Sequence, residues 1–161
     1  MRRGGRGQSM VEFSFVVIPF LLLLLGAVTA GLHAVEREVA ESAAANGVEV
    51  AATTTQPNDP TQPQLAAATA PTLQLLRPAM LGTEVRVLPA GRTCDAVGAI
   101  PVGTVEVCLW LDGSVRDAQG RPALVAETIR GTPATLIPWV GALLPDTLDL
   151  TLEARAVTYQ P

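Results

Sequence analysis

The chain has 161 residues, of which 48% are hydrophobic, 16% charged and 4% aromatic, and its formal net charge is −4. This charged fraction lies well below the usual quarter, which argues against a disordered acidic tail or a charged coiled coil. The negative balance argues against a nucleic-acid-binding domain, since such a domain needs a clustered basic face. The length suits about one folded domain.

A long uncharged segment lies near the N-terminus. Residues 13–35 contain no Asp, Glu, Lys or Arg. As a helix this segment reaches about 34 Å, enough to cross a bilayer core of about 30 Å. Arg2, Arg3 and Arg6 precede it, and the positive-inside rule then places the N-terminus in the cytoplasm. The sequence therefore predicts a single-pass membrane protein in contact with lipid, with an extracytoplasmic C-terminal domain.

Glu12 lies at the edge of this uncharged segment. It either marks the membrane interface or pairs with a buried cation, because a carboxylate at the centre of a bilayer costs at least about 2.5 kcal/mol. If the chain were cut after Gly7, Gln8 would gain an α-amino group one helical turn before Glu12. Pairing these two groups, within one helix or between neighbouring helices, would offset the desolvation of both charges.

The segment 7–13, GQSMVEF, resembles the N-terminus of type IVb prepilins. Residues 6–25, RGQSMVEFSFVVIPFLLLLL, resemble more closely the TadE-like pseudopilins of tight-adherence pilus systems. The resemblance implies cleavage between Gly7 and Gln8 by a prepilin peptidase, retention of the helix in the membrane, and a part in pilus assembly. It implies three partners: the peptidase, other pilins and pseudopilins, and the inner-membrane assembly platform. Phe13 stands where major pilins of this class more often have Tyr, which favours a minor pseudopilin.

Two other interpretations remain open at this point. The apolar segment resembles a secretory signal peptide cut before Gly31 or before Val35, which would release a secreted binding protein. It also suits an uncut anchor of an extracytoplasmic binding domain. Glu12 at the start of the apolar run argues against the signal peptide, as does a run longer than the usual 7–15 residues.

The helical pattern continues beyond the apolar segment. Pro19 lies inside it and should kink or loosen the helix, because proline removes one backbone hydrogen bond. Strong helix formers then extend one helix from about Ser9 to about Ala52. A narrow apolar stripe follows at four-residue intervals, formed by Val35, Val39, Ala43 and Gly47. His33 has no neighbouring metal-ligating cluster, so it is predicted to be an interfacial polar residue.

The rest of the chain predicts a small α+β domain with an antiparallel sheet covered by short helices. The segment 64–81 reads as a short helix that is interrupted near Pro71 and stopped near Pro78, and 132–144 reads as another. Alternating polar and apolar residues predict four strands. They are 83–88, 104–111, 122–130 and 148–159. Asp112-Gly113 is a turn signal after the second strand.

Cys94 and Cys108 are the two cysteines of the chain. An extracytoplasmic compartment is oxidising, so they are predicted to form a disulfide. The bridge would close a loop of about 15 residues and contribute about 3 kcal/mol. The alternative is two unpaired buried thiols.

Catalytic motifs are absent from the sequence. It contains no plausible Cys–His pair, HExxH, P-loop or GxGxxG. Four carboxylates in or near predicted loops are expected to be solvated; they are Asp95, Glu106, Asp112 and Asp117. We therefore predict no enzyme activity, no cofactor and no metal.

The predicted organisation has four parts. Residues 1–7 form a prepilin-type leader, 8–53 a transmembrane and spine helix, 54–63 a Pro-rich linker, and 64–161 the extracytoplasmic α+β domain. The predicted function is that of a minor, pilus-associated pseudopilin in the assembly of a tight-adherence type IVb pilus.

Overall fold

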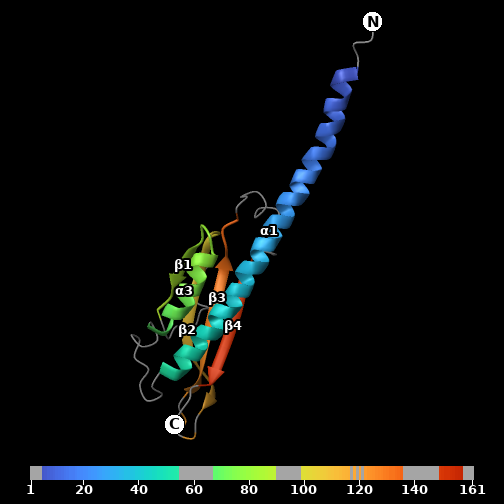
Figure 1. The fold of residues 1–161 in the computed structure, drawn as a ribbon. Helices are drawn as coiled ribbons and strands as arrows, with labels where there is room; N and C mark the ends of the chain where they lie inside the picture. The colour runs from blue at the N-terminus through green and yellow to red at the C-terminus, as the bar shows by residue number, and fades with distance from the viewer. Residues whose placement is uncertain are drawn as a thin grey trace.

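The computed structural model describes residues 5–54, 67–89, 99–116, 118, 120, 122–135 and 149–157. Its elements are α1 (Gly5–Thr54), α3 (Ala70–Ala79), β1 (Glu84–Val87), β2 (Thr104–Arg116), β3 (Pro122–Thr132) and β4 (Leu150–Val157). The strands form one sheet in the order β1-β2-β3-β4. The C-terminal half of α1 packs beside α3 and against the sheet, while its N-terminal half projects away from this head (Figure 1). The predicted α+β class is confirmed.

Helix α1 is a single element of 50 residues, and it continues on both sides of Pro19. At 1.5 Å per residue it is about 75 Å long. Hydroxyl groups in its apolar half bond within the helix: Ser14 donates to the Met10 carbonyl at 2.9 Å and Thr29 to the Leu25 carbonyl at 2.8 Å. These bonds leave an apolar outer surface, because the polar side chains are satisfied by the helix's own backbone.

The face of α1 that packs on the sheet differs from the predicted stripe. Val35 is 54% exposed, and Val39 is only half-buried. The buried residues recur at alternating intervals of three and one, so that each has another buried residue three or four positions away; they are Ala40, Ala43, Ala44, Gly47, Val48, Ala51 and Ala52. A strict four-residue interval drifts around a helix of 3.6 residues per turn, whereas a mixture of three and four stays on one face. The prediction of the stripe was therefore wrong in its first half.

Helix α3 begins where the sequence predicted an interruption. Pro71 lies in the first turn, where proline fits because the N–H it lacks would have no helical partner there. Pro78 lies in the last turn, and the helix ends at Ala79, as predicted. Thr72 and Leu76 face the interior. Apart from Thr54, which ends α1, the predicted linker 54–63 lies outside the described residues.

The sheet is mixed rather than antiparallel. β1 pairs with β2 in parallel, from Glu84 opposite Thr104 to Val87 opposite Val107. β2 with β3 and β3 with β4 are antiparallel. Parallel neighbours need a connection of a dozen or more residues to return the chain to the starting end. The connection 88–103 is long enough, but its sequence has no helical pattern to signal the crossover.

The predicted turn at Asp112-Gly113 is wrong. β2 continues through it to Arg116, which pairs with Pro122 across the hairpin, and the register shifts between Asp112 and Arg116. Asp112 Oδ1 accepts a hydrogen bond from the Ser114 N–H at 2.8 Å. This is the local bond of an Asx turn, here formed inside an irregular strand. The predicted helix 132–144 lies mostly outside the described residues, and β3 extends through Thr132.

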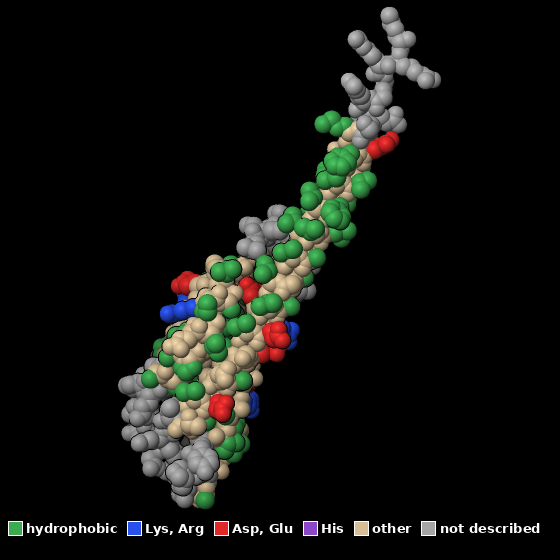
Figure 2. Space-filling view, in the orientation of Figure 1, with side chains coloured by type: hydrophobic (Ala, Val, Ile, Leu, Met, Phe, Trp, Pro, Cys, Tyr) green, Lys and Arg blue, Asp and Glu red, His purple; other side chains and the backbone are tan. Residues whose placement is uncertain are grey.

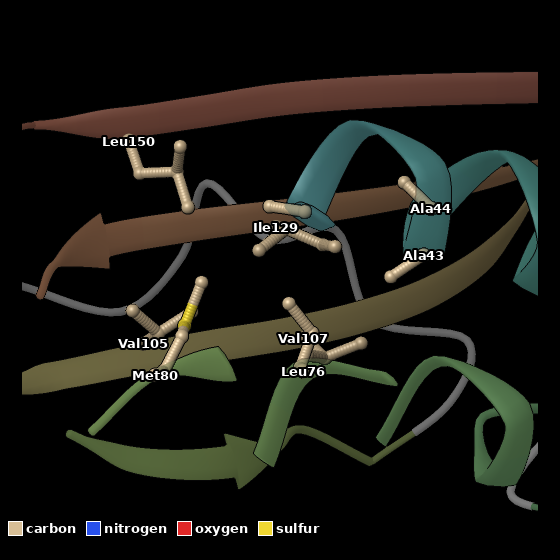
Figure 3. Packing of buried hydrophobic residues seen from close by; sticks show 9 residues of the cluster. Ala43, Ala44, Leu76, Met80, Val105, Val107, Ile129 and Leu150 are labelled. Atoms are coloured by element: carbon tan, nitrogen blue, oxygen red, sulfur yellow. The ribbon is translucent and has the colours of Figure 1, made fainter. Parts of the chain in front are cut away.

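The core lies between the sheet and the two helices (Figure 3). Val105, Val107 and Leu109 are fully buried on one face of β2, as predicted. Leu76 of α3, Met80 directly after that helix and the small residues of α1 cover this face. Glu106 and Cys108 on the opposite face are only 6% and 1% exposed. Both faces of β2 are therefore buried, and β1 and β3 pair with its two edges.

Candidate functional site

The predicted cleavage and charge residues lie in the first turns of α1. The helix begins at Gly5, so Gly7 and Gln8 are part of it, and Glu12 follows Gln8 by four residues. Glu12 is exposed. Four residues separate neighbours on one helical face. A new amino group on Gln8 would therefore stand one turn from this carboxylate.

The projecting half of α1 presents large apolar side chains in all directions. Phe13, Phe15 and Leu23 are 67%, 76% and 74% exposed, and Figure 2 shows hydrophobic side chains over the visible face of this half. A shallow apolar groove beside Pro19 is lined by Met10, Val11, Ser14, Phe15, Ile18 and Pro19. Such a surface suits a bilayer or a bundle of similar helices, because a helix apolar on all sides is not stable in water. The helix is long and apolar enough to cross a membrane.

The helix and the head meet at a small junction. His33 Nδ1 lies 2.9 Å from Glu36 Oε2. Glu36 is 9% exposed, and its burial raises the pKa of this carboxyl above its ordinary value, against the opposing effect of His33. A cavity of about 60 Å³ lies next to this pair, between Leu32 on α1 and Leu81 in the turn after α3. The polar residue predicted for the interface is therefore paired within its own helix.

A buried acid, which the sequence analysis did not single out, lies between α1, α3 and the sheet. Glu127 on β3 has no exposed surface. Its Oε2 accepts a hydrogen bond from the Thr72 hydroxyl at 3.1 Å, and its Oε1 has no hydrogen-bond partner among the described residues. Burial raises the pKa of Glu127 to about 7, although the Thr72 hydrogen bond acts in the opposite direction.

Gly47 of α1 makes room for this acid. A Cβ at position 47 would overlap Thr72 Oγ1 and Glu127 Oε2. The helix can therefore approach the sheet only with glycine at this position. One signal was present in the sequence, because Glu127 lies two residues from both Val125 and Ile129 and so had to share their face of the strand.

Two of the carboxylates expected to be solvated are buried and paired. Glu106 Oε2 lies 3.5 Å from Arg130 Nη2, and Asp112 Oδ2 lies 3.1 Å from Arg155 Nη1. The pairing across the sheet explains the difference, because β3, next to β2, carries Arg130, and β4, one strand further, carries Arg155. The other two, Asp95 and Asp117, lie outside the described residues.

The predicted disulfide involves one described cysteine. Cys108 is 1% exposed on β2. Cys94 lies outside the described residues, so the Cys94–Cys108 bridge stays a prediction. Within the described part of the chain, no group of three or more His, Cys, Asp or Glu side chains could hold a metal ion.

Comparison with known proteins gives one match. Residues 7–49 match the model of a family described as TadE-like protein. The match covers most of α1, including the part that packs on the head. No curated protein and no solved structure matches the chain.

Proposed function

Residues 7–49 belong to the TadE-like protein family, and from this premise we propose that the chain is a minor pseudopilin that takes part in assembling a tight-adherence type IVb pilus. Proteins of this family are components of such pili and are generally not enzymes. The observation that carries the proposal is that one family match runs without interruption from Gly7 to the part of α1 buried in the head. A retained helix, rather than a discarded export signal, accounts for that continuity.

In the proposed sequence of events, α1 inserts into the membrane with its N-terminus in the cytoplasm and the head outside. A prepilin peptidase cuts between Gly7 and Gln8. The apolar half of α1 then packs against the helices of other pilins and pseudopilins on the inner-membrane assembly platform. Its exposed Phe and Leu side chains favour both environments, because lipid and neighbouring helices cover apolar surface equally well.

Glu12 has a proposed role in assembly. Moving its carboxylate from the membrane interface into a helical array removes water from the charge, which is costly without a partner. The amino group that cleavage creates on Gln8 supplies a positive charge one turn away or on an adjacent subunit. Cleavage and assembly are linked in this way, since the uncut chain lacks that amino group.

The first test is the intact mass of the full chain from cells that carry an active prepilin peptidase, together with mapping of its N-terminal peptide. We expect a mature chain that begins at Gln8 and retains α1. Gly7→Leu should block processing, because a larger side chain must enter the peptidase site, while Gly5→Leu in the leader serves as a matched control that is still cut. A soluble product that begins at Gly31 or Val35 would instead identify a secreted protein. An uncut chain beside a processed reference pilin would identify a plain anchor.

The second test separates cleavage from assembly. Glu12→Ala should be processed normally but should enter the sheared pilus fraction poorly. Glu38→Ala is the matched control, because Glu38 is an exposed acid of the same helix beyond the apolar segment. Entry of the Glu12 variant at the level of the control would refute the charge-pairing role.

A further inference from the structure

Two equivalent turns lie at the end of the head from which α1 projects. In the first, the Thr83 N–H donates to the Met80 carbonyl at 3.2 Å, and Gly82 has a φ of 75°. A glycine with positive φ at the third position is the mark of a type II turn, and it leaves the second position, here Leu81, at the outer corner.

The second turn repeats this arrangement before β2. The Thr104 N–H donates to the Pro101 carbonyl at 3.1 Å, and Gly103 has a φ of 84°. Val102 therefore occupies the corner that Leu81 occupies in the first turn. Leu81 is 68% exposed and Val102 is 74% exposed. Polar residues, proline and glycine dominate turns in contact with water. Two large apolar side chains at turn corners therefore indicate that another molecule covers them.

The two turns are neighbours. The Glu84 N–H, just after the first turn, donates to the carbonyl of Gly103 in the second at 2.8 Å. A Cβ placed on either Gly82 or Gly103 would lie 3.8 Å from the Cβ of Ala134. Both apolar corners therefore belong to one surface around Ala134, which we call the corner surface: Leu81, Val102 and Ala134.

The corner surface lies beside the last part of the apolar segment of α1. Leu81 and Ala134 line the junction cavity together with Leu32 and Val35 of the helix. In Figure 1, the end of the sheet toward which β3 points lies beside the middle of α1. No spacer separates the head from the apolar segment.

The length of α1 places this surface relative to a bilayer. A hydrocarbon core of about 30 Å takes about 20 helical residues, so a span that begins near Phe13 ends near His33. Two pairs of ionisable side chains lie in this region. His33 Nδ1 is 2.9 Å from Glu36 Oε2, and Arg86 Nη2 is 2.9 Å from Glu84 Oε2. The corner surface is therefore level with the boundary between the acyl chains and the headgroups.

We propose that Leu81 and Val102 enter the interfacial region of the phospholipid bilayer that α1 crosses, so that the head rests on the extracytoplasmic surface of that bilayer. This inference rests on the proposed spanning role of α1. The head then contacts the membrane at α1 and at two turn corners, which restricts how it tilts. The occupant of the corner surface is lipid, because the surface is continuous with the lipid-facing side of the helix at Leu32 and Val35.

The test uses the full chain in vesicles of phosphatidylethanolamine and phosphatidylglycerol. Leu81→Cys and Val102→Cys each receive a nitroxide spin label, and the wild-type chain treated in parallel gives the background from the native cysteines. Collisions with oxygen, which concentrates in the acyl region, are compared with collisions with a water-soluble nickel chelate. Val115→Cys is the matched control, because Val115 is an apolar residue, 45% exposed, at the opposite end of β2. Leu22→Cys reports on the span of α1 itself.

We expect the ratio of oxygen to nickel collisions to be several-fold higher at positions 81 and 102 than at position 115. Equal ratios at the three positions, with position 22 facing lipid, would overturn this inference and leave the proposed function standing. Labels at 81 and 102 that are shielded from both reagents would overturn it too, because protein would then cover the corner surface. A nickel-accessible label at position 22 would overturn the spanning role and, with it, this inference.

Discussion

The buried acid of β3 makes the stability of the head depend on pH. Glu127 has no exposed surface, and burial raises its pKa from 4.5 to about 7. At about 1.4 kcal/mol per pH unit, this difference corresponds to a free energy of unfolding that falls by about 3 kcal/mol as the pH rises from the unfolded-state pKa to the folded-state pKa.

The sign follows from which state holds the proton. Between pH 4.5 and about pH 7 the folded chain keeps Glu127 protonated, whereas the unfolded chain has already released that proton. The folded state binds more protons over this range, so stability falls as the pH rises and levels off above pH 7. The contribution is fully present below pH 4.5.

The perturbation is Glu127→Gln, which keeps the shape of the side chain and removes its titration. Denaturant unfolding of the full chain in detergent micelles, followed by tryptophan fluorescence from pH 4.5 to above pH 7, should show a wild-type decrease that the variant lacks. Glu36 also has a raised pKa, and its slope in the same direction remains in both chains. Glu153→Gln on β4 is the control, because this side chain is 40% exposed and should leave the decrease intact.

The reasoning would be refuted by a variant that retains the full wild-type decrease. It would also be refuted if Glu127→Gln lowered stability equally at every pH, because the carboxyl would then act only as a hydrogen-bond acceptor for Thr72.

Three further predictions concern the packing of α1, the sheet and the predicted bridge. Gly47→Ala should destabilise the head by about 1–3 kcal/mol through overpacking, whereas Gly31→Ala, which meets no atom within 4 Å, should be neutral or stabilising; thermal unfolding in micelles measures both. Gly131→Ala should destabilise the head strongly, because Gly131 has a φ of 140° and a Cβ there would overlap the Thr104 carbonyl; the yield of folded protein and its melting temperature measure the loss. Cys94→Ser should cost about 3 kcal/mol if Cys94 and Cys108 are bridged, and thiol counting by mass under denaturing, non-reducing conditions should find none free in the wild type.

Each of these predictions has a result that would contradict it. Equal melting temperatures for the Gly47 and Gly31 variants would mean that α1 does not approach the sheet closely. A stable Gly131 variant would contradict the close pairing of β2 and β3. Two reactive thiols in the wild-type chain would support the alternative of buried, unpaired cysteines.

Local patterns in the sequence predict the elements of this molecule well. The uncharged segment and the helix formers after it predict α1 almost to its ends, and the breaker signals at Pro19 and at Asn46-Gly47 do not end the helix. The alternation of Val105, Val107 and Leu109 predicts the buried face of β2. These patterns depend only on residues close together in the chain, which is why they can be read without knowing the fold.

The features that the sequence did not predict correctly depend on contacts between distant parts of the chain. The parallel pairing of β1 with β2 follows from a long connection without a helical pattern. Asp112-Gly113 has the composition of a turn, but pairing with β3 keeps it inside β2. The sequence pattern places Glu127 in a strand, but its contacts with Gly47 and Thr72 exist only in the folded head. At such positions, contacts between distant parts of the chain determine the structure and override the local preference of the sequence.

The unbroken course of α1 couples the direction of the head to the rotation of the helix in the membrane. The helix enters the head at Glu36 without a flexible joint, so rotation about its long axis carries the sheet with it. Each residue of an α-helix turns by about 100°. One residue inserted near Gly31 would therefore swing the head through about a quarter of a turn and lift it by about 1.5 Å. The number of residues between Glu12 and Glu36 thus determines which side of the head faces a neighbouring subunit.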